Sequence, residues 1–454
     1  MSNKRYKLSG HPLSRHPIIM TIPPPKHDHS PLNFPEGFLW GAATSAHQVE
    51  GNNTNSDWWA YEQNLYPNMR SGKAANQYEL FEEDFELANN LGHNSHRLSI
   101  EWSRIEPQKG QFSQEAIDHY HQVFKSLKEK GFTIMLTLHH FTSPKWVADQ
   151  EGWKNSKTVN DFIKFVEKVV SEYREYVDLW ITINEPGIYV WQAYLSGVFP
   201  PHKKSWFDAF RATLNFVSAH KRAYKIIHKA VPNAQVGMSQ NTFSFRTLQA
   251  HSILQHILVW FYDLSTNHLF YILTGIKNHD FLGINYYFHS RVGSHNGSKF
   301  PKLLGADVTK KDVSDLGWEL HPEGIFDCLE DLSEYKKPIY ITENGLASTN
   351  DDRRCRFLIS YLKEIYHAIV SGVDVRGYFH WSLIDNFEWE HGFNPRFGLV
   401  EVDYESEKRT PRPSAFVYKD IIEHNSISHD LLRFIGHTVT ADEVLKRHES
   451  RHEE

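Results

Sequence analysis

Eight short β-rich runs recur along the chain, and longer amphipathic or polar stretches separate them. A strand followed by a helix, repeated eight times, favours parallel pairing, and eight such strands close into a barrel. The rival arrangement is an open, doubly wound sheet, but no glycine-rich phosphate loop follows the first run. We therefore predict an α/β fold, a single (β/α)8 TIM barrel, with its active site at the C-terminal ends of the strands. The eight runs cover residues 38–46, 93–100, 133–141, 177–185, 234–242, 281–287, 338–345 and 375–383.

Several of the intervening stretches carry apolar residues at helical spacing, i, i+3, i+4 and i+7. This spacing predicts helices over 114–131, 160–176, 206–230 and 351–372. The most apolar region, around Ile253 to Ile276, is interrupted by polar residues that include Asp263 and His268. We expect one or two packed amphipathic helices there rather than a membrane span.

Composition narrows the class of protein. The 454 residues are 40% hydrophobic and 23% charged, with a formal charge of −6, which is ordinary for a soluble globular protein and gives no sign of nucleic-acid or anionic-membrane binding. Two cysteines are too few for a disulfide framework. The N-terminal segment has no continuous apolar core of the secretory type, so we expect a cytoplasmic protein.

The ends of the chain differ from its middle. Residues 1–33 are polar and rich in proline and histidine, and we interpret them as an N-terminal arm. Residues 34–424 hold all eight runs and are expected to form the catalytic barrel. Residues 425–454 are interpreted as a polar C-terminal tail.

Two of the apolar runs end in a glutamate, Glu185 in VDLWITINEPG and Glu343 in PIYITENG. A carboxylate in that position is costly unless it is solvated, paired or functional. On a barrel both would project into one bowl, where two carboxyl groups cannot ionise independently. One can then serve as a general acid and the other as a nucleophile, as cleavage of a glycosidic bond requires. The plainer alternative is that each forms a salt bridge with an arginine.

Other polar and aromatic residues also fall at or just past strand ends. The eighth run leads into WSLIDNFEWEHGFNPRFGL, whose aromatic rings could form a platform for sugar CH faces or could simply pack in the core. Four polar residues at or just past different strand ends could hydrogen-bond sugar hydroxyls, although each alone could be structural: Gln48, His140, Asn285 and Glu388.

These segments resemble glycoside hydrolase family 1, the retaining β-glucosidase family. TINEP (182–186) resembles the acid/base segment and ITENG (341–345) the nucleophile segment, and further motifs follow in family order from about Phe34 to about Ile422. The resemblance implies hydrolysis of terminal non-reducing β-D-glucosyl residues by double displacement, with galactosyl or fucosyl residues as further candidates. It implies small β-glucosides or oligosaccharides as partners, no cofactor and no metal, and leaves the oligomeric state open.

The family's functional residues transfer by position. The resemblance implies Glu185 as the acid/base and Glu343 as the nucleophile, with Arg97 and Tyr287 beside the nucleophile and Asn285 in support. Trp381 would form the floor of the glycone subsite. The residues implied to bind the sugar hydroxyls are Gln48, His140, Asn184, Glu388 and Trp389.

The chain also departs from the family pattern. Phe141 stands where the family usually has tryptophan, so stacking beside the sugar is expected to be weaker, and the segment between the fifth and sixth runs is short. A 6-phospho-β-glucosidase is one alternative, but such members usually lose the Glu388-Trp389 pair. A thioglycosidase would typically carry glutamine at position 185. A catalytically weak carbohydrate-binding protein would be expected to lack one of the two glutamates.

Overall fold

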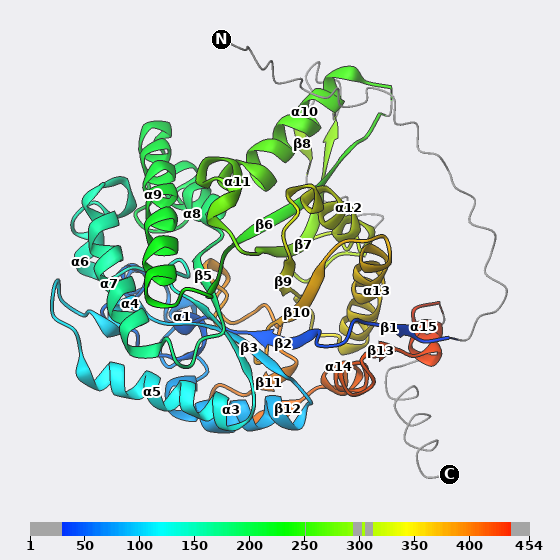
Figure 1. Cartoon of the computed structure of the whole chain (residues 1–454), viewed down its shortest axis with the longest axis horizontal. Helices are drawn as coiled ribbons and strands as arrows, with labels where there is room; N and C mark the ends of the chain where they lie inside the picture. Colours follow the sequence, from blue (N-terminus) through cyan, green and yellow to red (C-terminus); the bar gives the residue numbers. More distant parts are fainter. Residues whose placement is uncertain (1–29, 250, 294–301, 305–311, 437–454) are drawn as a thin grey trace.

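The computed structural model describes residues 30–249, 251–293, 302–304 and 312–436, and its centre is a closed barrel of parallel strands (Figure 1). Each strand pairs with the next in chain order, and β10 returns to pair with β2, which closes the barrel. All eight predicted runs are confirmed as strands, and the predicted barrel is confirmed with them. The barrel strands are β2 (Leu39–Ala43), β3 (Ser95–Ser99), β4 (Thr133–Thr137), β5 (Leu179–Asn184), β6 (Gln235–Thr247), β7 (Leu282–Gly293), β9 (Ile339–Asn344) and β10 (Val375–Trp381).

Helices surround the barrel, and the four predicted from spacing are present with bounds within a few residues of those expected. They are α5 (Gln114–Glu129), α7 (Lys157–Tyr173), α9 (Trp206–Ala230) and α13 (Asp351–Val370). The other α-helices are α1 (Ala46–Val49), α2 (Asp57–Glu62), α3 (Gln77–Asn90), α4 (Trp102–Ile105), α6 (Lys145–Ala148), α8 (Pro186–Val190), α10 (Ile253–Asp263), α11 (Leu269–Thr274), α12 (Glu323–Leu332), α14 (Pro413–His424) and α15 (His429–Gly436). Within the described ranges, two segments are π-helical, η3 (Trp191–Ser196) and η4 (Leu264–His268), and five are 3-10 helices: η1 (Pro67–Met69), η2 (Gly152–Lys154), η5 (Ile276–Asn278), η6 (Ser333–Tyr335) and η7 (Trp389–His391).

The core has two parts because each barrel strand is covered on both sides. Inside the barrel a smaller apolar cluster includes Met135, Ile181, Phe281 and Phe379, all fully buried. A larger cluster fills the space between the strands and the helices. Burying apolar surface on both faces stabilises the barrel, at about 25 cal/mol for each Å² removed from water. The result is a rigid frame that fixes the positions of the strand ends.

Irregular pairing occurs in four pairs of neighbouring barrel strands, mostly toward their C-terminal ends. The register shifts between Ile181 and Asn184, where β5 pairs with β6, and between Thr242 and Ser244, where β6 pairs with β7. Similar shifts bring Asn285 of β7 opposite Glu343 of β9, and they recur where β9 pairs with β10. Bulges at a barrel rim re-aim side chains. The polar residues at these strand ends therefore do not follow simple alternation.

The segments at the two ends of the described chain meet outside the barrel. Strand β1 (Leu32–Asn33), within the range assigned to the arm, pairs antiparallel with β13 (Ser426–Ile427), within the range assigned to the tail. Residues 1–29 of the arm and 437–454 of the tail lie outside the described residues. The part of the chain that the structure describes also contains the short strands β8 (Lys302–Leu304), β11 (Val400–Val402) and β12 (Arg409–Pro411).

The apolar region around Ile253 to Ile276 forms two α-helices joined by the π-helix η4. The expectation of packed helices is correct for α11, which buries Phe270 and Tyr271. It is wrong for α10, which directs large apolar side chains outward. No helix among the described residues is long and apolar enough to cross a membrane.

Candidate active site

Glu343 lies near the end of β9 and is almost fully buried. Arg97 of β3 donates from Nη1 to its Oε1 at 2.5 Å, and the Tyr287 hydroxyl of β7 donates to its Oε2 at 2.6 Å. Burial, and the nearby charge of Glu343, raise the pKa of Tyr287 well above its ordinary value, so this phenol stays a donor. Both carboxylate oxygens are therefore held by donors, which fixes the direction of the group.

Glu185 follows β5 directly and has a left-handed backbone conformation, with φ of 44°, at the start of α8. Its Oε1 accepts hydrogen bonds from Nδ2 of Asn285 at 2.7 Å and from Nδ2 of Asn241 at 3.1 Å. Burial and, to a lesser extent, the charge of Glu343 raise the pKa of Glu185 to about 8, against the lowering effects of the two asparagines and of Arg97. At neutral pH this carboxyl group is therefore largely protonated and can give up a proton.

A chain of hydrogen bonds joins the two carboxyl groups. Arg97, which binds Glu343, also donates from Nη2 to Oδ1 of Asn184 at 2.7 Å. Asn285, which binds Glu185, donates to the same Oδ1 at 3.2 Å. The glutamates thus share one buried polar network and have different environments, one beside a guanidinium and one among neutral amides. Two carboxyl groups whose surroundings differ in this way are suited to separate acid and base roles.

The predicted sugar-binding residues lie around this network. His140 hydrogen-bonds with Nδ2 of Asn184 at 3.3 Å, and its ring lies nearly parallel to the rings of Trp381 and Trp389. Burial, together with the charge of Arg97, holds the pKa of His140 well below its ordinary value, so the ring is neutral. Trp381 donates from Nε1 to Oε1 of Glu388 at 3.1 Å. Burial raises the pKa of Glu388 to about 8, against the effect of that hydrogen bond.

Gln48 reaches the same region from α1. Its Nε2 donates to Oδ1 of Asn386 at 3.0 Å and to the carbonyl of Phe387 at 2.8 Å, while its Oε1 accepts from the Ser45 hydroxyl at 2.7 Å. These contacts attach Gln48 to the segment that carries Glu388. The structure thus brings all of the site residues predicted from the sequence into one connected region.

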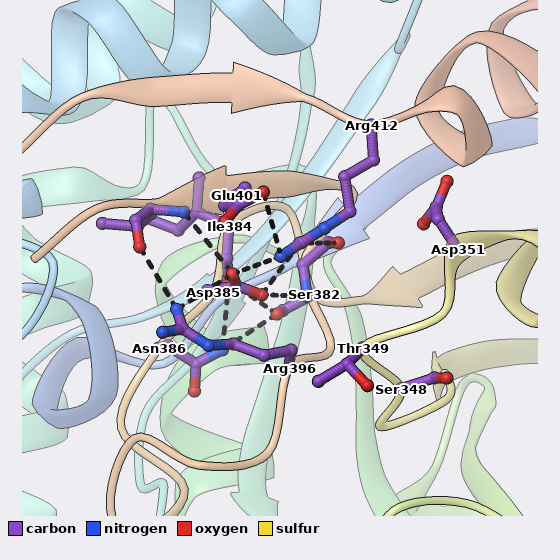
Figure 2. A network of polar contacts seen from close by, with 12 residues as sticks. Ser348, Thr349, Asp351, Ser382, Ile384, Asp385, Asn386, Arg396, Glu401 and Arg412 are labelled. Carbon is purple, nitrogen blue, oxygen red and sulfur yellow. Dashed lines mark hydrogen bonds and ion pairs between the residues drawn. The ribbon is translucent and has the colours of Figure 1, made fainter.

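A second polar network supports the segment after β10, and sequence reasoning missed it (Figure 2). Arg412 donates to both oxygens of the buried Asp385, at 3.0 and 2.7 Å, and Arg396 contacts the same carboxylate at 3.2 Å. Asn386, the partner of Gln48, donates to the Ser382 hydroxyl at 2.8 Å. This network fixes the turn between Trp381 and Glu388. Asp385 and Arg412 lie far apart in sequence, and no pattern marks them as a pair.

Asn241, which donates to Glu185, is a further residue that sequence reasoning missed. It lies at the C-terminal end of the fifth run, which ends in QNT, and the rule that singled out Asn285 would have selected it as well.

The aromatic residues near Trp389 are mostly structural. Phe387 and Phe397 are almost completely buried. Phe141 is also buried, has a φ of 69°, and packs edge-on against Trp389 with ring centroids 5.4 Å apart. Phe141 therefore supports the ring of Trp389. Trp381 and Trp389 are the candidates for a platform on which a sugar ring could stack.

Among the described residues, one group has the ligand types of a metal site close together: Asp263, His268 and Asp331. Nε2 of His268 lies 2.6 Å from Asp331 and 3.3 Å from Asp263, which are direct ion-pair distances. Burial lowers the pKa of His268, but its hydrogen bonds to the two aspartates raise it to about 11. The same atoms that could hold a metal form ion pairs with one another, and we interpret the group as an ion-pair cluster.

Comparison with known sequences gives matches over most of the chain. The sequence model of Glycosyl hydrolase family 1 matches residues 30–253 and 267–427. A β-galactosidase of Pyrococcus woesei is 31% identical, and the match covers 87% of this chain and 98% of the relative. β-Glucosidase A of Thermotoga maritima is 30% identical with the same coverage. A 6-phospho-β-galactosidase of Staphylococcus aureus is 32% identical over 87% of this chain and 99% of the relative.

Solved structures give the same picture. A β-glycosidase from Pyrococcus horikoshii superposes with a TM-score of 0.84 at 39% identity, covering 90% of this chain and 99% of that one.

Proposed function

The chain belongs to glycosyl hydrolase family 1 and is a retaining β-glycosidase; on this premise we propose that Glu343 is its nucleophile and Glu185 its acid/base. The observation that carries the assignment is the difference in environment. Glu343 accepts from a guanidinium and a phenol, whereas Glu185 is buried among amides with a pKa raised to about 8. A nucleophile must be ionised, and a general acid must hold its proton near neutral pH.

The reaction then proceeds in two steps on these two groups. Glu343 attacks the anomeric carbon while Glu185 gives its proton to the glycosidic oxygen, and the aglycone leaves. Loss of that proton leaves Glu185 ionised, so it can accept a proton from the water that cleaves the glycosyl–Glu343 bond. Its pKa is expected to fall when Glu343 is esterified, because the neighbouring negative charge is then gone.

We further propose that Gln48, His140, Glu388 and Trp389 hold the glycone, with Trp381 as its floor. Neutral His140 can donate to or accept from a sugar hydroxyl. Asn184 accepts hydrogen bonds from Arg97 and Asn285, the residues that bind the two carboxyl groups, and it is suited to the 2-hydroxyl, whose hydrogen bond strengthens in the transition state. The proposed substrates are small β-glucosides or oligosaccharides. Residues 34–424 are proposed to form the catalytic domain, and the proposed location of the protein is the cytoplasm.

Azide rescue tests the two roles separately. In Glu185→Ala an aryl glucoside with a good leaving group should still form the glycosyl-enzyme, but its hydrolysis should be slow because the base is missing. Azide needs no deprotonation, so it should restore turnover and give the β-glycosyl azide. Glu343→Ala should lose turnover of every β-glucoside, since no glycosyl-enzyme can form. If azide rescues Glu343→Ala to the α-azide but does not rescue Glu185→Ala, the role assigned to Glu185 is rejected. If azide rescues neither variant although both are correctly folded, both roles are rejected.

A further inference from the structure

Helix α10 exposes an apolar face to solvent. Four of its large side chains are more than half exposed: Ile253 at 72%, Ile257 at 55%, Trp260 at 61% and Phe261 at 53%. Leu254 adds to the same face at 45%. Single exposed apolar residues are ordinary on protein surfaces, but a contiguous set on one helix marks an interaction site.

The face is a stripe with a defined direction. Residues advance by about 100° along a helix, so Ile253, Ile257, Trp260 and Phe261 fall within about one third of its circumference. The opposite side faces the protein: Gln255 is buried, its Oε1 accepts from the backbone N–H of Gln249, and its Nε2 donates to Oε1 of Gln249. The helix is therefore anchored through a polar residue while its apolar residues face outward. This is the reverse of the usual amphipathic pattern of a surface helix.

The position of α10 separates it from the active site. The family model matches up to residue 253 and resumes at 267, so the helix lies almost wholly in the unmatched interval. It follows the long β6 strand, whose pairing with β7 extends to Thr247 and Val292, and in Figure 1 it lies at the periphery of the molecule. The exposed stripe is thus a feature of this chain rather than part of the barrel common to the family.

The surroundings of the stripe exclude most charged partners. Residues 247–262 contain no aspartate, glutamate, lysine or arginine, and the chain as a whole carries −6. Interfacial helices that bind anionic membranes carry lysine and arginine beside their apolar face, and α10 has neither. An apolar centre with aromatic residues and no charges is instead typical of interfaces between protein subunits.

The arrangement of residues along the stripe is self-complementary. Ile253 and Phe261 lie at equal distances on either side of Ile257, so two antiparallel copies of α10 can pack about Ile257 with each Ile253 against the other copy's Phe261. The exposed fractions leave an apolar area on the order of 500 Å² on the stripe. With a rim of neighbouring residues such as Leu248, which is 49% exposed, this approaches the roughly 800 Å² per subunit of a standard interface.

We propose that α10 is a two-fold dimerisation surface, and that its partner is α10 of a second copy of this chain. The inference concerns assembly and does not depend on the roles of Glu185 and Glu343. Sedimentation velocity and light scattering on the full chain should find a dimer at micromolar concentration. Ile257→Asp and, separately, Trp260→Glu should each shift it to the monomer, because each places a charge in the apolar contact. Tyr66→Asp is the matched control, since it changes another exposed ring (81%) and should leave the dimer intact.

A cross-link tests the symmetry. A residue on a two-fold axis faces its own copy, so Ile257→Cys should form an intermolecular disulfide under mild oxidation. The two natural cysteines, Cys328 and Cys355, are buried and should not react. Cysteine in place of Val370, which is 61% exposed on α13, is the control and should stay monomeric on a denaturing gel. A monomeric wild type, or a dimer unaffected by both charge variants, would overturn the proposal. Binding to phosphatidylcholine vesicles that Ile257→Asp abolishes, with no dimer in solution, would assign the surface to lipid instead.

Discussion

Asn241 is the residue through which the acidity of the catalytic pair can be tested most directly. It donates to Glu185 and to no other group of the site among the contacts described. A donor to the charged form of a carboxyl group lowers its pKa, so removing Asn241 should raise the pKa of Glu185 above about 8.

Because a general acid acts in its protonated form, Asn241→Ala should extend activity to higher pH. The alkaline limb of the profile of kcat/KM, which reports the free enzyme, should move upward by up to about one pH unit. Glu388 also titrates near 8, but it has no hydrogen bond to Asn241, so a shift specific to this variant identifies Glu185. Asn241→Ser, which keeps a donor, should restore part of the wild-type profile. A limb that stays in place or moves to lower pH contradicts the assignment.

Glu388 provides a test of substrate choice. Its carboxyl group lies beside Trp381 in the proposed glycone site, and because its pKa is raised to about 8, it is charged at pH 9, where a sugar phosphate would meet a like charge. At pH 9 an aryl β-glucoside should therefore be preferred over its 6-phosphate. Glu388→Gln should reduce that preference by about 10- to 100-fold in kcat/KM, since hydrogen bonds to charged groups contribute about 1.5–3 kcal/mol. If the wild type prefers the phosphate, its substrates are instead phosphorylated glycosides, as the name of the 6-phospho-β-galactosidase relative would suggest.

The two glutamates could be predicted from sequence because each ends an apolar strand, where a carboxyl group is costly without a purpose. Their partners were harder to predict. Asn285 and Asn241 occupy equivalent places at the ends of neighbouring strands, yet only the first belongs to a recognisable motif. The bonds from Asp385 to Arg396 and Arg412 depend on how distant loops fold together, which no local pattern contains.

Among helices and strands, the regular elements were predictable and the irregular ones were not. The short β-rich runs located all eight barrel strands, but β6 and β7 extend well past the predicted runs because they pair with each other beyond the barrel. Hydrophobic periodicity also does not indicate which side of an apolar helix packs against the protein. Helix α10, whose large apolar side chains face outward, was for this reason predicted wrongly. The π-helix η4 between α10 and α11 was not foreseen either. It places His268 beside Asp263 and Asp331.

The ion pairs of His268 should stabilise this junction in a pH-dependent way. The pKa of His268 is about 11 in the folded protein, compared with about 6.5 for a free histidine. A raised folded-state pKa gives stability that is complete below about pH 6.5 and is lost as pH rises toward 11. His268→Gln should therefore lower the free energy of unfolding by about 1–2 kcal/mol at pH 6, a figure reduced for the partial exposure of Asp331.

The difference between His268→Gln and wild type should shrink steadily when denaturation is repeated at pH 8 and pH 10. Asp331→Asn is the matched partner variant, and a double-mutant cycle isolates the contribution of the pair. A cost that is constant or grows with pH would show that the side chain acts by packing alone.

The two ends of the described chain are held together at the N-terminal end of the barrel, away from the catalytic groups. Asn425 connects them: its Oδ1 accepts from Nε1 of Trp40 at 2.9 Å, and its Nδ2 donates to the carbonyl of Phe34 at 2.9 Å. It ends α14 with a φ of 49°, a left-handed conformation that asparagine and glycine tolerate best. One side chain thus ends a helix and joins the first barrel strand to the last helices.

Substitution at Asn425 should therefore lower stability and leave the chemistry unchanged, because residues at this end of a (β/α)8 barrel serve stability. Asn425→Gly keeps the backbone conformation and loses the hydrogen bonds, so it should cost about 1–3 kcal/mol. Asn425→Ala should cost about 1 kcal/mol more, because alanine also resists the left-handed conformation. Calorimetry should rank the melting temperatures as wild type, then Gly, then Ala, while kcat/KM at 25 °C stays within about two-fold of wild type for all three. Equal melting temperatures for the Gly and Ala variants would remove the backbone part of this account. A fall in kcat/KM without a fall in melting temperature would mean that the closure of the chain ends reaches the catalytic face.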